Sequence, residues 1–236
     1  MSHSIYPESL NPLFQIDGND TPPKIDGDNT APFLGRVGDL WVRKGIGYKP
    51  EQRTDIAFSE PAEAVEALLL VEQFAGEVWD PSAGVGTIAR VFGVHLGKGI
   101  KSTDLYDHGN LEVGSGVDFL LQNGPTVDCI VCNPPFSLVI PFVRKAGELA
   151  RQKVAFFGPI RWLESKSRYE QLWQPFGLSR LWIFPYRLRV ATNKTPAGRG
   201  GGVLYGWFVW EIGGPPVPEL RWFPFRSRPY PGGNSK

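Results

Sequence analysis

The chain has 236 residues, of which 42% are hydrophobic, and its formal net charge at pH 7 is +1. This length and apolar content predict one full α/β core with short extensions. A net charge so close to zero argues neither for nor against a nucleic-acid partner. No apolar run has the length of a membrane span or the form of a signal peptide, so we expect a cytoplasmic protein with no membrane partner.

The first part of the chain predicts an arm ahead of the main domain. Residues 1–32 are rich in Asn, Asp, Pro and Gly with few spaced apolar residues, which favours an extended or disordered segment. Residues 33–53 mix aromatic and basic side chains, and form either a small packed appendage or a strip that touches substrate. The predicted partition is an N-terminal arm, a main domain and a Pro- and Arg-rich C-terminal tail: 1–54, 55–212 and 213–236.

Apolar periodicity within the main domain predicts alternating strands and helices. The expected strands are 77–80, 99–104, 127–132, 154–157, 179–184 and 204–211. The expected helices are 61–75, a helix-like stretch at 88–92, 138–151 and 166–173, and Pro61 suits the first turn of the first of them. This order predicts an α/β fold with a mostly parallel sheet and helices on both faces. We expect seven strands in the sheet, of which the ranges above give six.

A glycine-containing turn follows the first strand of this domain. Residues 78–87 read VWDPSAGVGT and run from a short apolar strand into a helix. Such turns bring backbone amides up to a nucleotide-like ligand. The spacing is not Gly-x-Gly-x-x-Gly, and no Gly-Lys-Ser/Thr follows, so neither a hydride carrier nor a triphosphate is favoured.

Two acidic residues follow this turn at informative positions. Asp104 ends the next expected strand, about 20 residues after the turn, where an acid typically holds ribose hydroxyls. Asp118 precedes Phe119 and further apolar residues, beside which an adenine ring could lodge. The spacing therefore favours a nucleoside-containing ligand.

The tetrapeptide Asn133-Pro134-Pro135-Phe136 is the most informative motif in the chain, because it closes the apolar run 127–132. Ligands bind at this end of the strands in open α/β sheets. The prolines stiffen the backbone, and the Pro134 carbonyl is available as an acceptor. An amide oxygen, a carbonyl and an aromatic ring suit the primary amine of a nucleobase. The alternative is that the tetrapeptide only forms a turn and has no functional role, and the glycine turn upstream argues against this alternative.

The two cysteines, Cys129 and Cys132, form a C-x-x-C pattern inside the same expected strand. Side chains three positions apart on a strand point to opposite faces, so they can neither bond to each other nor share a metal ion. The chain has only three histidines and no second cysteine pair, and we predict no metal site. We expect both thiols to be small, buried apolar groups, and free thiols agree with a cytoplasmic location.

Charge is divided unevenly along the chain. Residues 144–199 contain 12 Lys and Arg against 3 Asp and Glu, whereas residues 51–128 contain 4 against 13. This division is expected if a polyanion lies over the second half, although charges spread around a solvated surface would give the same counts. The candidate phosphate contacts are Arg161, Lys166, Lys194 and Arg199. Trp162 either stacks on a base or packs beneath the rim.

In this order the motifs resemble those of class I S-adenosylmethionine-dependent methyltransferases with an Asn/Asp-Pro-Pro-aromatic motif, most closely the small adenine-specific DNA methyltransferases of phages and prophages. The resemblance covers roughly residues 55–212. It implies a Rossmann-like fold and S-adenosyl-L-methionine as cofactor. It implies that the catalytic residues are Asn133, Pro134, Pro135 and Phe136, and that the cofactor-binding residues are Asp80, Pro81, Ala83, Gly84, Gly86, Asp104, Asp118, Phe119 and Asn133.

The resemblance further implies methyl transfer to the N6 amine of adenine in DNA. Alternatives that keep the motif are an RNA base amine, the cytosine N4 amine in DNA and a glutamine amide in a protein. An alternative from another class is a catalytically silent nucleic-acid-binding module. The chain departs from larger DNA methyltransferases because no segment is long enough for a separate target-recognition domain. The target sequence and the oligomeric state stay open.

Overall fold

The computed structural model divides the chain into two compact units, Met1–Asp55 and Ile56–Lys236. It describes residues 33–37, 40–43, 58–124, 126–192, 203–214 and 217–224. In the first unit, β1 (Phe33–Val37) pairs with β2 (Leu40–Arg43) as an antiparallel hairpin. This part of the predicted arm therefore has regular structure of its own.

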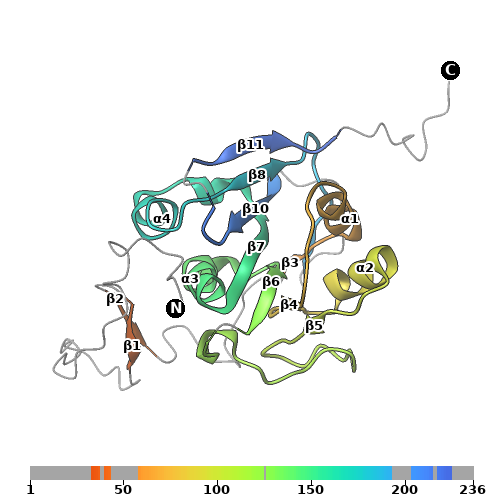
Figure 1. Cartoon of the computed structure of the whole chain (residues 1–236), viewed down its shortest axis with the longest axis horizontal. Helices are drawn as coiled ribbons and strands as arrows, with labels where there is room; N and C mark the ends of the chain where they lie inside the picture. Colours follow the sequence, from red (N-terminus) through yellow and green to blue (C-terminus); the bar gives the residue numbers. More distant parts are fainter. Residues whose placement is uncertain are drawn as a thin grey trace, which may run out of the picture. The chain divides into compact units, whose positions relative to one another are not determined.

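A seven-stranded sheet runs through the second unit (Figure 1). Its strands are β4 (Val78–Asp80), β5 (Lys101–Ser102), β6 (Val127–Cys132), β7 (Ala150–Pro159), β8 (Arg180–Ile183), β10 (Tyr205–Glu211) and β11 (Glu219–Trp222). They are arranged in the order β11-β8-β10-β7-β6-β4-β5. Only β10 is antiparallel to its neighbours, so the prediction of a mostly parallel seven-stranded sheet is confirmed. A separate short pair joins β3 (Phe58–Ser59) to β9 (Ala191–Thr192).

Helices cover both faces of the sheet, as expected. They are α1 (Ala62–Val71), α2 (Thr87–Leu96), α3 (Val139–Leu149) and α4 (Lys166–Arg168), and α4 continues as a π-helical turn, Tyr169–Trp173. Short 3₁₀ turns lie at Phe119–Leu121, Phe136–Leu138 and Ile160–Leu163. Figure 1 shows α1 and α2 on one side of the sheet and α3 on the other. No helix in the described part of the chain is both long and apolar enough to cross a membrane.

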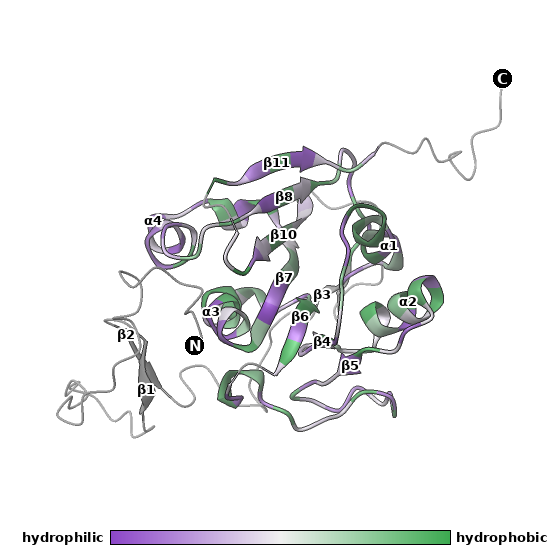
Figure 2. Cartoon of the chain, in the orientation of Figure 1, coloured by the Kyte–Doolittle hydropathy of each residue, from purple (hydrophilic) through white to green (hydrophobic). Residues whose placement is uncertain are grey.

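Two hydrophobic cores lie on the two faces of the sheet, because successive strand residues point to opposite sides. On β6, Ile130 and Cys132 join the core beneath α3, whereas Cys129 and Val131 join the core beneath α1 and α2. The same alternation runs through β7, β8 and β10. Figure 2 shows β6 as largely hydrophobic. The prediction that the two cysteine side chains point to opposite faces is therefore confirmed, and both thiols are free and buried.

The seventh strand, β11, comes from a segment that the sequence placed in the C-terminal tail. It pairs in parallel with β8 and forms one edge of the sheet. Its four residues are exposed. They mix polar with apolar side chains, as Figure 2 shows, and prolines nearby in the sequence argue against a strand, so the pattern did not predict one. Phe223 anchors its end by stacking on Phe184 at 4.3 Å and Trp182 at 5.5 Å between ring centroids. The sheet thus extends past residue 212, where the predicted main domain ended.

An ion-pair network holds together the end of the sheet at which the parallel strands begin. Glu72, just after α1, accepts hydrogen bonds from Arg180 Nε at 2.6 Å, Lys153 Nζ at 2.7 Å and Trp182 Nε1 at 2.8 Å. Arg180 also pairs with Glu211 at 2.5 Å. Burial alone would raise the pKa of Glu72, but the hydrogen bonds from Arg180, Lys153 and Trp182 outweigh it and lower that pKa. The Glu72 carboxylate therefore joins α1, β7 and β8, and Arg180 extends the network to Glu211 of β10.

We expect Glu72→Gln to lower the free energy of unfolding by about 3 kcal/mol at pH 7, because it removes the charge that compensates the largely buried side chains of Lys153 and Arg180. Urea unfolding measures this loss. Because the pKa of Glu72 is lowered on folding, its contribution is present above about pH 4.5, its ordinary pKa, and is lost as the pH falls through the folded value. The difference between wild type and variant should therefore shrink in acid. The control Glu66→Gln, at a side chain 44% exposed, should cost under about 0.5 kcal/mol.

Candidate functional site

The candidate site lies along the edge of the sheet that is formed by the carboxyl ends of the parallel strands β4, β5 and β6. Strand register pairs Asp80, the last residue of β4, with Ser102, the last residue of β5. Asp104 follows β5 by two residues, and Asn133 follows β6 directly. Strands β5 and β6 flank β4 and run parallel to it. The three polar residues expected from the sequence therefore lie together, at the edge formed by the carboxyl ends of these strands.

The turn after β4 presents its backbone at this edge. Ala83 N donates to Thr103 O at 3.1 Å, and Gly84 N donates to Asp104 Oδ2 at 2.9 Å. Gly84 and Gly86 have φ values of 53° and 82°, which side chains other than glycine rarely adopt. A Cβ on Gly86 would lie 2.6 Å from Asn110 Nδ2, whereas one on Gly84 would meet nothing within 4 Å. The turn is thus packed on one side and open at Gly84.

The carboxylate of Asp104 joins two loops of the site. Besides the Gly84 amide, it accepts a hydrogen bond from Tyr106 N at 2.9 Å, and His108 Nε2 lies 3.3 Å from Oδ1. Val117 N donates to the Asp104 carbonyl at 3.1 Å, which brings the segment before Asp118 to the same edge. Each carboxylate oxygen has two lone pairs, so Asp104 retains capacity for hydroxyl donors.

Asp80 is fully buried at the end of β4. Its Oδ1 accepts a long hydrogen bond of 3.3 Å from Ser82 N, and its Oδ2 is buried with no hydrogen-bond partner among the described residues. Burial and the nearby carboxylates of Glu60 and Asp104 raise the pKa of Asp80 well above its ordinary value. A buried carboxylate beside two others favours a positively charged hydrogen-bond donor as its complement.

Glu60 belongs to this site although the sequence analysis did not identify it. It lies just before Pro61 and α1, and its Oε2 accepts a hydrogen bond of 3.0 Å from Asn133 Nδ2. Ser82 Oγ donates to the Asn133 carbonyl at 3.1 Å. Burial raises the pKa of Glu60 to about 7, which the Asn133 hydrogen bond partly opposes. The only signal in the sequence is an acid ahead of a helix, and helix starts commonly carry one.

An aromatic cluster surrounds Phe136 next to Asn133. The Phe136 ring meets Trp162 edge-on at 5.5 Å and Tyr205 at 6.5 Å between ring centroids. Trp162 is only 2% exposed, and a Cβ on Gly158 would lie 2.1 Å from its ring. Trp162 therefore packs in the core below the carboxyl ends of the strands and contacts Phe136 from the side. Tyr205, which the sequence analysis also missed, is buried, and the Arg161 guanidinium opposes the rise that burial causes in its pKa.

Asp118 and Phe119 lie in the 3₁₀ turn that follows this edge. Asp118 Oδ1 accepts from Leu120 N at 3.0 Å and so caps the turn. The Phe119 ring points into the core, where it packs against Trp79 and Phe142 with centroid distances of 5.3 and 4.9 Å. The Phe119 ring thus packs in the core beneath this end of the strands and is not exposed to a ligand.

The predicted nucleic-acid contacts are placed only in part. Arg161 and Lys166 are exposed on the segment after β7, on the Phe136 side of the sheet, with Lys166 87% exposed and 3.6 Å from Glu170. Lys194 and Arg199 lie outside the described residues. Other cations of the basic half are engaged elsewhere, because Lys145 pairs with Glu148, and Lys153 and Arg180 bind Glu72. The charge count thus overstates the cation density near Phe136.

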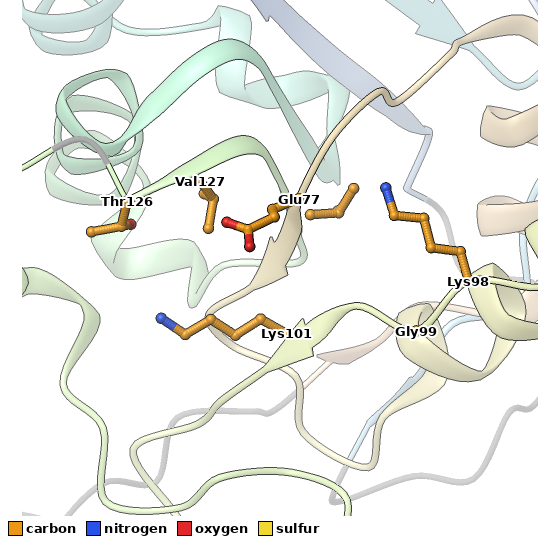
Figure 3. A pocket seen from close by; sticks show the side chains of 7 residues that line it. Glu77, Lys98, Gly99, Lys101, Thr126 and Val127 are labelled. Atoms are coloured by element: carbon orange, nitrogen blue, oxygen red, sulfur yellow. The ribbon is translucent and has the colours of Figure 1, made fainter.

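A cavity of about 340 Å³ lies at the opposite end of the sheet, where β4, β5 and β6 begin. Figure 3 shows Glu77, Lys98 and Lys101 around it. Lys98 donates to the Gly76 carbonyl, and Lys101 lies 3.8 Å above the Trp79 ring, so both amines already have contacts. Within the described ranges, no group of three or more His, Cys, Asp and Glu side chains is arranged to hold a metal ion.

Comparisons with known proteins show similarity in structure but not in sequence. No family model and no curated protein matches the chain. The modification subunit of a putative type I restriction enzyme from Vibrio vulnificus aligns with a TM-score of 0.50 at 13% identity, over 75% of this chain and 49% of that subunit. This chain therefore spans about half of that subunit's length.

Two further solved structures align less closely. A putative RNA methyltransferase from Pyrococcus horikoshii has a TM-score of 0.45 at 18% identity, over 64% of this chain and 81% of that one. TrmN from Thermus thermophilus has a TM-score of 0.43 at 24% identity, over 64% and 48%. Together with the sheet topology, the Vibrio alignment shows that the chain has the Rossmann-like fold of class I methyltransferases.

Proposed function

We propose that this chain is an S-adenosylmethionine-dependent methyltransferase that methylates the exocyclic N6 amine of adenine in DNA. The observation that carries the proposal is the convergence of Asn133-Pro134-Pro135-Phe136 with Asp80 and Asp104 at one edge of the sheet. An amine-binding tetrapeptide and a nucleoside-binding set of acids are both needed for this reaction, and here they are neighbours.

The residues at this edge fit the proposed cofactor. Asp80 Oδ2 is buried and has no hydrogen-bond partner in the part of the chain that the structure describes. With Glu60 and Asp104 near it, this oxygen suits a ligand that carries positive charge. Asp104 has acceptor capacity for ribose hydroxyls, and the open side of Gly84 leaves room for the ligand to approach the backbone. When bound, the cofactor supplies a methyl group on a positively charged sulfur.

The tetrapeptide fits the acceptor amine. The Asn133 side-chain oxygen and the Pro134 carbonyl would accept the two amine hydrogens, which favours a tetrahedral, nucleophilic nitrogen. Phe136, held edge-on by Trp162, would cover the flat face of the base. No covalent nucleophile is required, so the protein contributes mainly alignment of the nitrogen with the methyl carbon at about 3 Å and electrostatic stabilisation.

A nucleic-acid substrate is favoured by Arg161 and Lys166, which are exposed on the segment after β7. A base within a duplex would have to swing out to reach Phe136, at a cost of a few kcal/mol. The alternatives are an RNA base amine, the cytosine N4 amine and a protein glutamine amide. A catalytically silent nucleic-acid-binding module is the remaining alternative. The intact set of Asp80, Asp104 and Asn133 at one edge argues against it.

The test is transfer of labelled methyl from S-adenosylmethionine to unmethylated duplex DNA, single-stranded DNA and RNA, followed by nucleoside mass spectrometry. We expect N6-methyldeoxyadenosine in DNA. Label in N4-methylcytosine or in RNA would keep the reaction and replace the substrate. Label absent from all three polymers, with the cofactor still bound, would favour a protein glutamine substrate or a non-catalytic role. If calorimetry detects no binding of S-adenosylmethionine, the enzymatic proposal fails.

We expect Asn133→Ala to lower turnover by about 10²-fold or more, because it removes one aligned contact made in the transition state. Affinity for the cofactor should stay nearly unchanged. Single-turnover kinetics and calorimetry separate the two effects, and a thermal unfolding curve checks that the variant folds. Wild-type turnover in this variant would show that Asn133 does not bind the reacting amine.

We expect Asp104→Asn to weaken cofactor binding by about 10-fold, because a charged acceptor for the ribose and for the Gly84 amide is lost. Turnover at saturating cofactor should change less. Asp107→Asn is the matched control, since Asp107 is an exposed acid of the same loop that accepts a hydrogen bond from Gly109 N. Equal cofactor affinity in wild type and Asp104→Asn would contradict the ribose role of Asp104.

A further inference from the structure

We propose that Glu60 is a positioning residue for the transfer reaction, because its carboxylate holds the side-chain amide of Asn133 in the one orientation that directs the amide oxygen away from Glu60, toward the reacting amine. This inference rests on the proposed function. The two ends of an asparagine amide have nearly the same shape, so hydrogen-bond partners decide its orientation.

The contact between Glu60 and Asn133 joins residues 73 positions apart in the sequence. Both side chains are buried, and Asn133 Nδ2 lies 3.0 Å from Glu60 Oε2. A carboxylate accepts but does not donate, so an ionised Glu60 can bind only the nitrogen end of the amide. A hydrogen bond to a charged acceptor is also about twice as strong as a neutral one, which makes the selection of one orientation effective.

The two ends of this contact are held by separate elements. Glu60 is fixed by the extended backbone of Pro61, whose carbonyl accepts from Ala64 N in the first turn of α1. The backbone of Asn133 is fixed by β6 and by the hydrogen bond that Ser82 Oγ donates to its main-chain carbonyl. The turn after β4 and the end of β6 therefore hold the backbone of Asn133, while Glu60, at the start of α1, orients its side-chain amide.

The orientation matters because the two ends of the amide have opposite hydrogen-bonding character. An exocyclic amine presents N–H donors, which the oxygen end accepts. In the reversed amide, an NH₂ group would face those donors, and the buried Glu60 carboxylate would face an oxygen. Both contacts would be repulsive, so the reversed state is excluded as long as Glu60 is ionised.

The ionisable groups around Glu60 set the pH range of this control. Asp80 from β4 and Cys132 from β6 face it, and Asp104 lies next to Asp80. Burial raises the pKa of Glu60 to about 7. Above that pH the carboxylate selects the nitrogen end of the amide. Below it, a protonated Glu60 can donate to the oxygen end, and the selection is lost.

A double-mutant cycle tests whether Glu60 acts through Asn133. At saturating cofactor and DNA, we expect Glu60→Ala to lower kcat by about 10-fold or more, the scale of one hydrogen bond to a charged group. In the Asn133→Ala background the same substitution should cost nothing further. Glu60→Gln keeps an acceptor and should recover part of the loss, and the control Glu66→Gln on α1 should match wild type. Equal losses in both backgrounds, or no loss, would overturn the proposal.

A second measurement does not depend on activity. The NMR signals of the Asn133 side-chain NH₂, assigned by their disappearance in Asn133→Ala, should shift with a midpoint near pH 7 in wild type and not in Glu60→Gln. Signals that ignore pH, or that shift equally in Glu60→Gln, would contradict the Glu60 contact. If these signals titrate as expected but no polymer is methylated, the proposed function fails while the contact stands.

Discussion

The parallel register of β4, β5 and β6 is the constraint on which the site depends. Because these neighbouring strands end at one edge, a turn, an acid and an amide from distant parts of the sequence come together there. The register is held by two cores that take alternate residues from each strand. A slip of one residue would exchange the two faces, so the packing that stabilises the sheet also positions the polar edge.

Sequence patterns predicted strands correctly where the strand residues are fully buried, and failed where those residues are partly or fully exposed. Strand β6 spans 127–132, as predicted, because both faces of its apolar run are buried. Strand β7 begins four residues earlier than predicted, at Ala150, which pairs with β6. Lys153 pairs with both β6 and β10, but the polar stretch 151–153 lacks the apolar signal. Strand β11 was missed because all four of its residues are exposed at a sheet edge. Edge strands carry little of the pattern on which such predictions depend.

The candidate site divides in the same way. Asp80, Asp104 and Asn133 were identified because each lies at the end of a strand or within two residues of it, and position along the strand predicts position in space. Glu60 and Tyr205 were missed because their place in the site follows from tertiary contacts, with Asn133 for one and with Phe136 for the other. Phe119 was predicted to contact the cofactor, but its ring packs in the core against Trp79.

Buried carboxylates have opposite electrostatic surroundings at the two ends of the sheet. Glu72 is surrounded by cations, whereas Glu60 and Asp80 face one another with raised pKa values. Under the proposed function, the cofactor arrives with a positive sulfur that this acidic edge attracts, and it leaves neutral at that atom once the methyl group has gone. The attraction between these carboxylates and the sulfur is therefore weaker after methyl transfer than before it.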